Sequence, residues 1–243
     1  MNICIFGSGA IGSYIGALLM KSGIKVSLIC RGDHLKAIQN NGLLMQSAET
    51  NNEYFCKPLA TDDPNTIEKQ DFIIVTLKAH SAALTANTLT PLMKKNTTVV
   101  SAVNGLPWWY FYKVNNKFEN MRLKSVDPKN LQWDNITPQR SLGCVVYPAA
   151  EIKAPGHVYH IEGDRFPIGE PDGSISNRVQ ELSKILINSG LKSPVRKNIR
   201  ADIWMKLWGN LAFNPISVLT GETLEEIANN SSSCAIVKNM MLE

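Results

Sequence analysis

Three polar residues recur at every fourth position late in the chain, at Lys206, Asn210 and Asn214. This spacing places them on one face of a helix. One ammonium followed by two amides is suited to grasping a small polar ligand, since the set offers both hydrogen-bond donors and acceptors. The alternative is a solvated helix face, although such a face usually carries more charge, of both signs. Apolar residues of the same segment repeat with the same period and are expected to face the core: Ile203, Leu207 and Leu211.

A glycine-rich motif lies between an apolar run at 2–6 and an apolar helical pattern at 13–20. Its first glycine permits a tight turn, its second lets a pyrophosphate approach the backbone, and its third lets the helix lie close to the strand. The N–H groups at the helix start would then face the phosphates. A purely structural turn is the alternative, and the strand–turn–helix context favours a dinucleotide site. The motif consists of Gly7, Ser8, Gly9, Ala10, Ile11 and Gly12.

Arg31 follows the second apolar strand pattern, at 25–30. An NAD-binding unit usually has a carboxylate here, which accepts hydrogen bonds from the adenosine ribose and would repel a 2′-phosphate. Arginine instead offers a charged fork that fits a phosphate. We therefore predict NADP(H) as the cofactor. The alternative is an exposed surface arginine with no ligand.

Two further strand patterns, at 71–77 and 97–103, are each followed by a polar residue, Lys78 and Asn104. The carboxyl ends of parallel strands border the ligand crevice of an open α/β sheet. The lysine could hold a phosphate, a carboxylate or a ribose hydroxyl, and the asparagine could both donate and accept hydrogen bonds. The alternatives are an exposed loop lysine and an ordinary Asn-Gly turn.

Composition excludes several classes of function. The net charge of +4 suits an anionic cofactor or substrate but is too small and scattered to indicate nucleic acid. No apolar run reaches the roughly 18 residues that span a bilayer, and a core strand begins at the N-terminus, so we expect a cytoplasmic protein without a membrane partner. The five cysteines show no metal-ligand spacing, and His157 and His160 point to opposite sides of a strand, so no metal is expected.

These patterns predict an α/β fold with a Rossmann-type doubly wound sheet. Strand patterns at 142–147, 156–161 and 165–169 are separated by short turns, which predicts an antiparallel extension of that sheet. Helical patterns begin at 176, beyond the turn residues 170–173. The predicted domains are therefore 1–172, which binds NADP, and 173–243, a helical domain for substrate and dimerisation. The aromatic cluster 107–111 is expected to form a surface lid or an interface, and 115–140 an irregular insertion.

With these motifs in place, the chain resembles the ketopantoate reductase (2-dehydropantoate 2-reductase) family. The matching features are GSGAIG at 7–12, Arg31, VTLKAH at 75–80, Asn104 with Gly105, and IRADIWMKLWGNLAFNP at 199–215. The last motif is specific to this family among Rossmann-type dehydrogenases. The resemblance extends from residue 1 to about residue 225.

The resemblance implies NADPH-dependent reduction of 2-dehydropantoate to (R)-pantoate, a step toward pantothenate and coenzyme A. It implies that Lys206 is the general acid and that Asn210 and Asn214 hold the substrate. Lys78 and Asn104 would border both the nicotinamide ribose and the substrate. The residues of the motif at 7–12 would hold the pyrophosphate, with Arg31 on the 2′-phosphate.

One departure from the family is the length of the second domain. Members are longer, and their later helices bring a substrate-binding serine and an active-site glutamate, whereas this chain ends at Glu243. We therefore expect an incomplete helical domain, with a homodimer as the candidate assembly. Two alternatives remain open: an NADP-binding but catalytically incomplete module, and a related reductase acting on another 2-keto acid.

Overall fold

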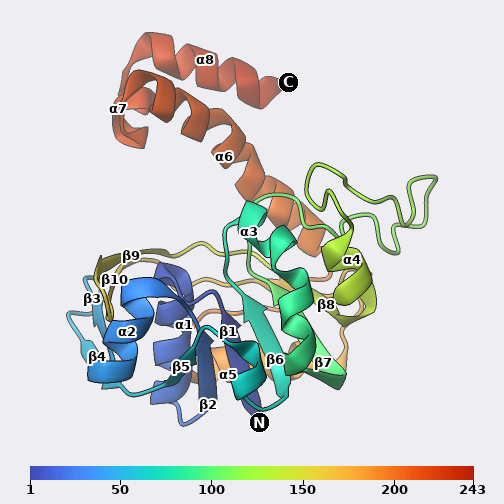
Figure 1. Cartoon of the computed structure of the whole chain (residues 1–243). Coiled ribbons are helices and arrows are strands. Elements are labelled where there is room, and N and C mark those ends of the chain that lie inside the picture. The colour runs from blue at the N-terminus through green and yellow to red at the C-terminus, as the bar shows by residue number, and fades with distance from the viewer. The chain divides into compact units, whose positions relative to one another are not determined.

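The computed structural model describes all residues, 1–243, and divides into two compact units. The sheet unit is Met1–Ile199 and the helical unit is Arg200–Glu243. Figure 1 shows the strands confined to the first unit, whereas the second is helical. None of the helices is long and apolar enough to cross a membrane.

The main sheet of the sheet unit has seven strands in the order β11-β8-β7-β6-β1-β2-β5. All neighbouring pairs are parallel except β11 and β8. Strands β1 and β6 are buried along almost their whole length, as expected for parallel strands covered on both faces. The Rossmann-type prediction is thus confirmed. The strands are β1 (Asn2–Phe6), β2 (Lys25–Ile29), β5 (Leu59–Thr61), β6 (Gln70–Val75), β7 (Met93–Ser101), β8 (Ser141–Cys144) and β11 (Ile168–Gly169).

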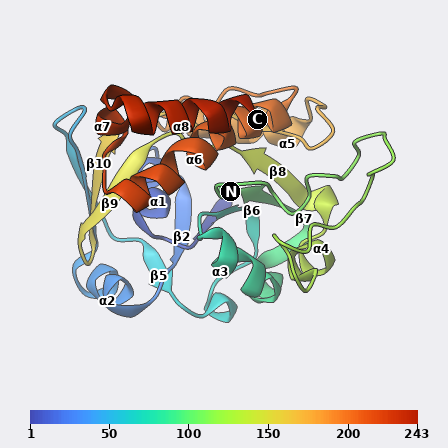
Figure 2. The same cartoon turned by 90° about the horizontal axis from the view of Figure 1, so that it is seen from above.

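Helical segments connect these strands and cover the sheet (Figure 2). Helix α1 buries Tyr14, Ile15 and Leu19 against the strands. The α-helices of the sheet unit are α1 (Ala10–Lys21), α2 (Gly32–Asn41), α3 (Ala79–Leu84), α4 (Leu131–Asn135) and α5 (Asn177–Asn188). The 3₁₀ turns are η1 (Pro64–Thr66), η2 (Ala86–Leu92) and η3 (Pro138–Arg140).

A second sheet of four strands has the order β4-β3-β10-β9. It consists of β3 (Leu43–Ser47), β4 (Glu53–Cys56), β9 (Ala149–Ala154) and β10 (His157–Glu162). The predicted antiparallel extension of the main sheet is present only as β11 against β8, because β10 leaves that sheet and pairs parallel with β3. The edge of β3 opposite β4 needs partners for its backbone groups, and β10 supplies them.

The boundary between the units lies after Ile199 rather than at 172, where the sequence pattern placed it. The apolar stripe of α5 packs into the core of the sheet unit through Val179, Leu182 and Leu186. The segment after α5 then forms an isolated parallel β-bridge with β11, in which Val195 pairs with Ile168. The helical pattern that begins at 176 is therefore part of the sheet unit, because its apolar face is buried there.

The helical unit contains most of α6 (Ile199–Thr220), together with α7 (Leu224–Asn229) and α8 (Ser231–Leu242). Its core is small and consists of four buried residues, Ala212, Ile216, Ile227 and Val237. The expectation that Leu211 faces the core is wrong, because its side chain is 53% exposed. Ala212 and Ile216, one position further round the helix, form the inward stripe instead, since α7 and α8 pack on that side.

Candidate functional site

The carboxyl ends of four neighbouring strands lie level with one another. In the parallel register Phe6 is opposite both Ile29 and Val75, and Val75 is opposite Ser101. The sheet continues in opposite directions from β1, toward β2 on one side and β6 on the other, so β1 stands at a topological switch point. Ligands of open α/β sheets bind in the crevice at such a point.

The residues that follow these four strands are therefore brought to one edge of the sheet. Gly7 follows β1 directly, and Arg31 follows β2 after one residue. Lys78, the N-cap of α3, and Asn104 follow β6 and β7 after two residues each. The order of the sheet places β2, β1, β6 and β7 next to one another. The structure thus gathers every cofactor-side residue that the sequence singled out.

The glycine turn is shaped by Gly7 and Gly12. Gly7 has φ +102°, and its N–H donates to the carbonyl oxygen of Ile29 at 3.0 Å. A Cβ added at Gly12 would lie 2.7 Å from the carbonyl oxygen of Gly7 and 2.6 Å from the Oγ1 of Thr76. Glycine at these two positions is required by the fold itself, because a side chain would collide with the protein.

Gly9 is different, because the fold gives no reason for it. It is exposed, its φ is −82°, and an added Cβ would meet only the Gly7 carbonyl oxygen, at 4.0 Å. It is also the N-cap of α1, where no side chain caps the helix and no acidic residue occupies the first turn. The open side of Gly9 and the uncapped N–H groups fit a pyrophosphate approaching the backbone.

Arg31 and Lys78 are exposed cations at this edge, and neither forms an ion pair. Arg31 is the N-cap of α2 and Lys78 the N-cap of α3, both with extended backbone. Binding an anion would therefore break no existing salt bridge. Burial, with the Asp62 carboxylate second, raises the pKa of the Cys30 thiol to about 11, so this neighbour of Arg31 stays neutral at pH 7.

The polar residues spaced by four late in the chain lie on α6. Lys206, Asn210 and Asn214 fall within one uninterrupted helix, Ile199–Thr220, as their spacing predicted. They belong to the helical unit, whereas the cofactor-side residues belong to the sheet unit.

Sequence reasoning missed Thr76, the residue directly after β6. Its Oγ1 donates to the Gly7 carbonyl oxygen at 2.8 Å and so ties the glycine turn to the neighbouring strand end. The signal was available, because Thr76 is the first polar residue after the apolar run of β6 and precedes Lys78 by two positions. This hydrogen bond stabilises the turn.

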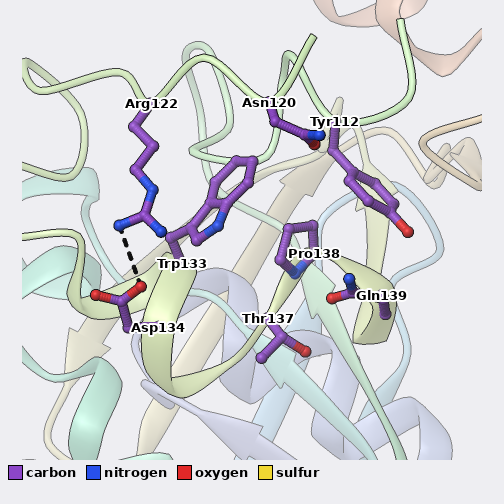
Figure 3. Close-up of a pocket in the computed structure, with 8 residues that line it drawn as sticks. All are labelled: Tyr112, Asn120, Arg122, Trp133, Asp134, Thr137, Pro138 and Gln139. Atoms are coloured by element: carbon purple, nitrogen blue, oxygen red, sulfur yellow. Dashed lines mark ion pairs between the residues drawn. The ribbon is translucent and has the colours of Figure 1, made fainter.

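A separate cavity of about 550 Å³ lies within the segment 112–139. Figure 3 shows Trp133 and Tyr112 on its walls and the ion pair between Arg122 and Asp134 at its side, 3.2 Å apart. It contains none of the predicted site residues. The candidate site at the strand ends is thus distinct from this cavity.

Two residues of the aromatic cluster 107–111 are buried rather than part of a surface lid. Trp108 and Trp109 are only 4% and 0% exposed, so that expectation is wrong for both. The Nε1–H of Trp109 donates a hydrogen bond to the Ser101 Oγ at 3.1 Å, and the indole ring packs against Gly143 of β8. Gly143 leaves the space that the indole ring fills, and this complementarity keeps the tryptophan in the core.

A glycine turn at the switch point of a parallel sheet is typical of the Rossmann-type dinucleotide-binding proteins. The model of the family "Ketopantoate reductase PanE/ApbA" matches residues 3–173, and that of its C-terminal domain matches residues 198–243. The chain belongs to the ketopantoate reductase family of oxidoreductases.

Individual relatives agree with this assignment. A 2-dehydropantoate 2-reductase of Mesorhizobium japonicum is 46% identical over the whole chain, which covers 74% of that protein. A candidate ketopantoate reductase from Ralstonia solanacearum MolK2 has a solved structure with 36% identity and a TM-score of 0.93, matching 99% of this chain and 74% of its own. The 2-dehydropantoate 2-reductase structure from Geobacter metallireducens GS-15 has 25% identity and a TM-score of 0.85, matching 100% and 73%.

Proposed function

We propose that the chain catalyses the NADPH-dependent reduction of 2-dehydropantoate to (R)-pantoate. The observation that carries the proposal is the 46% identity, over the whole chain, to a relative named 2-dehydropantoate 2-reductase. The site chemistry agrees, since the chain combines a dinucleotide turn with a lysine that can act as a proton donor. The reaction adds a hydride to the keto carbon and a proton to its oxygen.

Arg31 supports NADP(H) over NAD(H). It stands where NAD-binding units usually have an acidic residue, and it forms no ion pair that a phosphate would have to displace. Its guanidinium can hold the 2′-phosphate through two parallel hydrogen bonds. The residues of the turn at 7–12 would hold the pyrophosphate, and the cofactor when bound would supply the hydride.

Lys206 is assigned as the general acid. As hydride reaches the keto carbon, negative charge develops on the carbonyl oxygen, and an ammonium group stabilises this charge before donating the proton. Asn210 and Asn214 lie one and two helical turns further along α6 and are assigned to the hydroxyl and carboxylate side of the substrate. Lys78 and Asn104, at the strand ends, would border the nicotinamide ribose and the substrate.

A second candidate function is an NADP-binding module without turnover. In this reading the chain binds NADP and a partner, and the exposed apolar residues of the helical unit would suit such a partner: Val218 and Leu219 are 84% and 81% exposed. A third is a related reductase, because two D-mandelate dehydrogenase structures share this fold at 21% identity with TM-scores of 0.81 and 0.80. The fold by itself therefore does not select the keto acid.

The proposal is tested by following NADPH oxidation with ketopantoate and with a panel of other 2-keto acids. We expect turnover with ketopantoate and the highest kcat/KM for it. Calorimetric binding of NADPH without turnover on any keto acid would favour the binding module. Faster turnover on another member of the panel would favour the related reductase.

A further inference from the structure

His34 joins three separate parts of the sheet unit. It lies on α2, its Nε2 is 3.1 Å from the Ser13 Oγ of α1, and its Nδ1 accepts a hydrogen bond from the Gly156 N–H, also at 3.1 Å. Gly156 forms the turn between β9 and β10. One imidazole ring therefore connects both helices that flank β2 with the second sheet.

These contacts set the tautomer of the ring. The Gly156 N–H can only donate, so Nδ1 of the neutral imidazole has no proton and Nε2 has one. Nε2–H then donates to the Ser13 Oγ, which is left to donate its own hydrogen to Ser8, whose Oγ lies at 2.8 Å and carbonyl oxygen at 3.3 Å. The result is a directed chain from the second sheet to the second residue of the glycine turn.

The two serines of this hydrogen-bond chain are buried and His34 is half-buried, which makes the geometry of the serines costly to disturb. Ser8 and Ser13 are 2% and 0% exposed. Burial also lowers the pKa of His34 and so favours the neutral ring that the hydrogen-bond pattern requires. A buried polar group that loses its partner destabilises its surroundings, so Ser13 and Ser8 are sensitive to any change at His34.

Helix α2 also presents Arg31, its N-cap residue. The turn at Gly156 rests on the same helix, since an added Cβ there would lie 3.1 Å from the Cβ of Ala37. His34 thus fixes α2 against α1 on one side and against the second sheet on the other. The spacing between the glycine turn and Arg31 depends on this connection.

We propose that His34 is a positioning residue for the dinucleotide: it holds the glycine turn and Arg31 at the separation that a pyrophosphate and a 2′-phosphate of one molecule require. The inference rests on the proposed NADP(H) binding. His34 itself contacts neither phosphate in this account. Its effect is transmitted through Ser13 to the turn and through α2 to Arg31.

The test is a double-mutant cycle on the full chain with His34→Ala and Arg31→Ala. The dissociation constants of NADPH and NADH are measured by calorimetry. We expect His34→Ala to weaken NADPH by roughly tenfold, within the range for coupled neighbouring sites, and to weaken NADH less. In the Arg31→Ala background the NADPH-specific part of this loss should vanish, because the group that His34 positions is gone. His34→Gln, whose amide can still serve Ser13, should recover part of the affinity.

His157→Ala is the matched control, since this half-buried histidine of β10 bonds Gln46 rather than the turn, and it should leave both constants unchanged. If His34→Ala does not fold, Ser13→Ala is measured instead. It removes the hydrogen bond from His34 to Ser13 but leaves the one from Gly156 to His34, and it should still weaken NADPH by more than twofold. An NADPH affinity within twofold of wild type, or full additivity with Arg31→Ala, would overturn the inference. Lack of NADPH binding by the wild type would instead refute the proposed function.

Discussion

The sheet unit and the helical unit differ in how firmly each holds its functional residues. In the sheet unit the cofactor-side residues follow strands whose register is fixed on both sides, and the glycine turn is tied to β2 and to Thr76. In the helical unit Lys206 and its two asparagines share one helix above a core of four residues. Cofactor binding should therefore tolerate damage that abolishes the chemistry.

Replacing Lys206 by Ala should separate turnover from cofactor binding more strongly than any other change. We expect kcat with ketopantoate to fall by about 10²- to 10⁴-fold, the usual contribution of a general acid. NADPH affinity, measured by calorimetry, should stay at the wild-type value because the glycine turn and Arg31 are untouched. Unchanged turnover would remove Lys206 from its assigned role.

Ile227→Ala tests whether the small helical core is independent of the sheet. Ile227 is fully buried in that core, and removal of its side chain should destabilise the helical unit by about 2–5 kcal/mol. Hydrogen exchange should accelerate in α7 and α8 while β1 and β6 stay protected. Val218→Ser, at an 84% exposed position, is the control and should leave hydrogen exchange unchanged in both the helices and the strands. Equal loss of protection in the strands would show that the units unfold together.

Two alanine substitutions in the glycine turn separate the glycine that the fold requires from the glycine that ligand binding requires. Gly12→Ala forces a Cβ to within 2.7 Å of the Gly7 carbonyl oxygen, and overpacking of this kind costs about 1–3 kcal/mol. Gly9→Ala meets nothing closer than 4.0 Å, so its melting temperature should match the wild type. Its methyl group nevertheless occupies the approach to the backbone, and NADPH affinity should fall. A Gly9→Ala variant with wild-type affinity would move the pyrophosphate elsewhere.

The smallest expected effect is on stability and comes from Asp172, just after β11. Hydrogen bonds from Ser174, and then Lys113 at 2.9 Å, hold the pKa of Asp172 well below its usual range despite partial burial. A depressed folded-state pKa stabilises the protein above the unfolded value of about 3.9 and ceases to do so as the pH falls through the folded value. Asp172→Asn should lower the free energy of unfolding by about 0.5–1 kcal/mol at pH 7, a modest figure because the pair is partly exposed.

Denaturant titrations of wild type and Asp172→Asn at pH 7 and pH 3 check this expectation. The difference between the two proteins should shrink at pH 3. A constant difference across this range would show that the carboxylate charge does not contribute.

The sequence predicted best what depends on near neighbours in the chain. The roles of Gly7 and Gly12 followed from the strand–turn–helix pattern, and the common edge of Arg31, Lys78 and Asn104 followed from the parallel alternation of strands. Both rest on rules that act within a βαβ unit.

The rest depended on partners far away in the sequence. The pairing of β10 with β3 could not be read from either strand, since neither pattern specifies its neighbour. Trp109 is buried because Gly143 leaves room for its ring. Leu211 and Ala212 fit the same helical period almost equally well, and the positions of α7 and α8 decided which faced inward.

The central claim, that the carboxyl edge of the main sheet is an NADP(H) site, is tested most directly by calorimetric titration of the chain. NADPH and NADH are titrated into the wild type and into Arg31→Ala. We predict one site per chain, tighter binding of NADPH than of NADH, and loss of that preference in the variant. Equal affinity for both dinucleotides in the wild type, or no binding of either, would contradict the account.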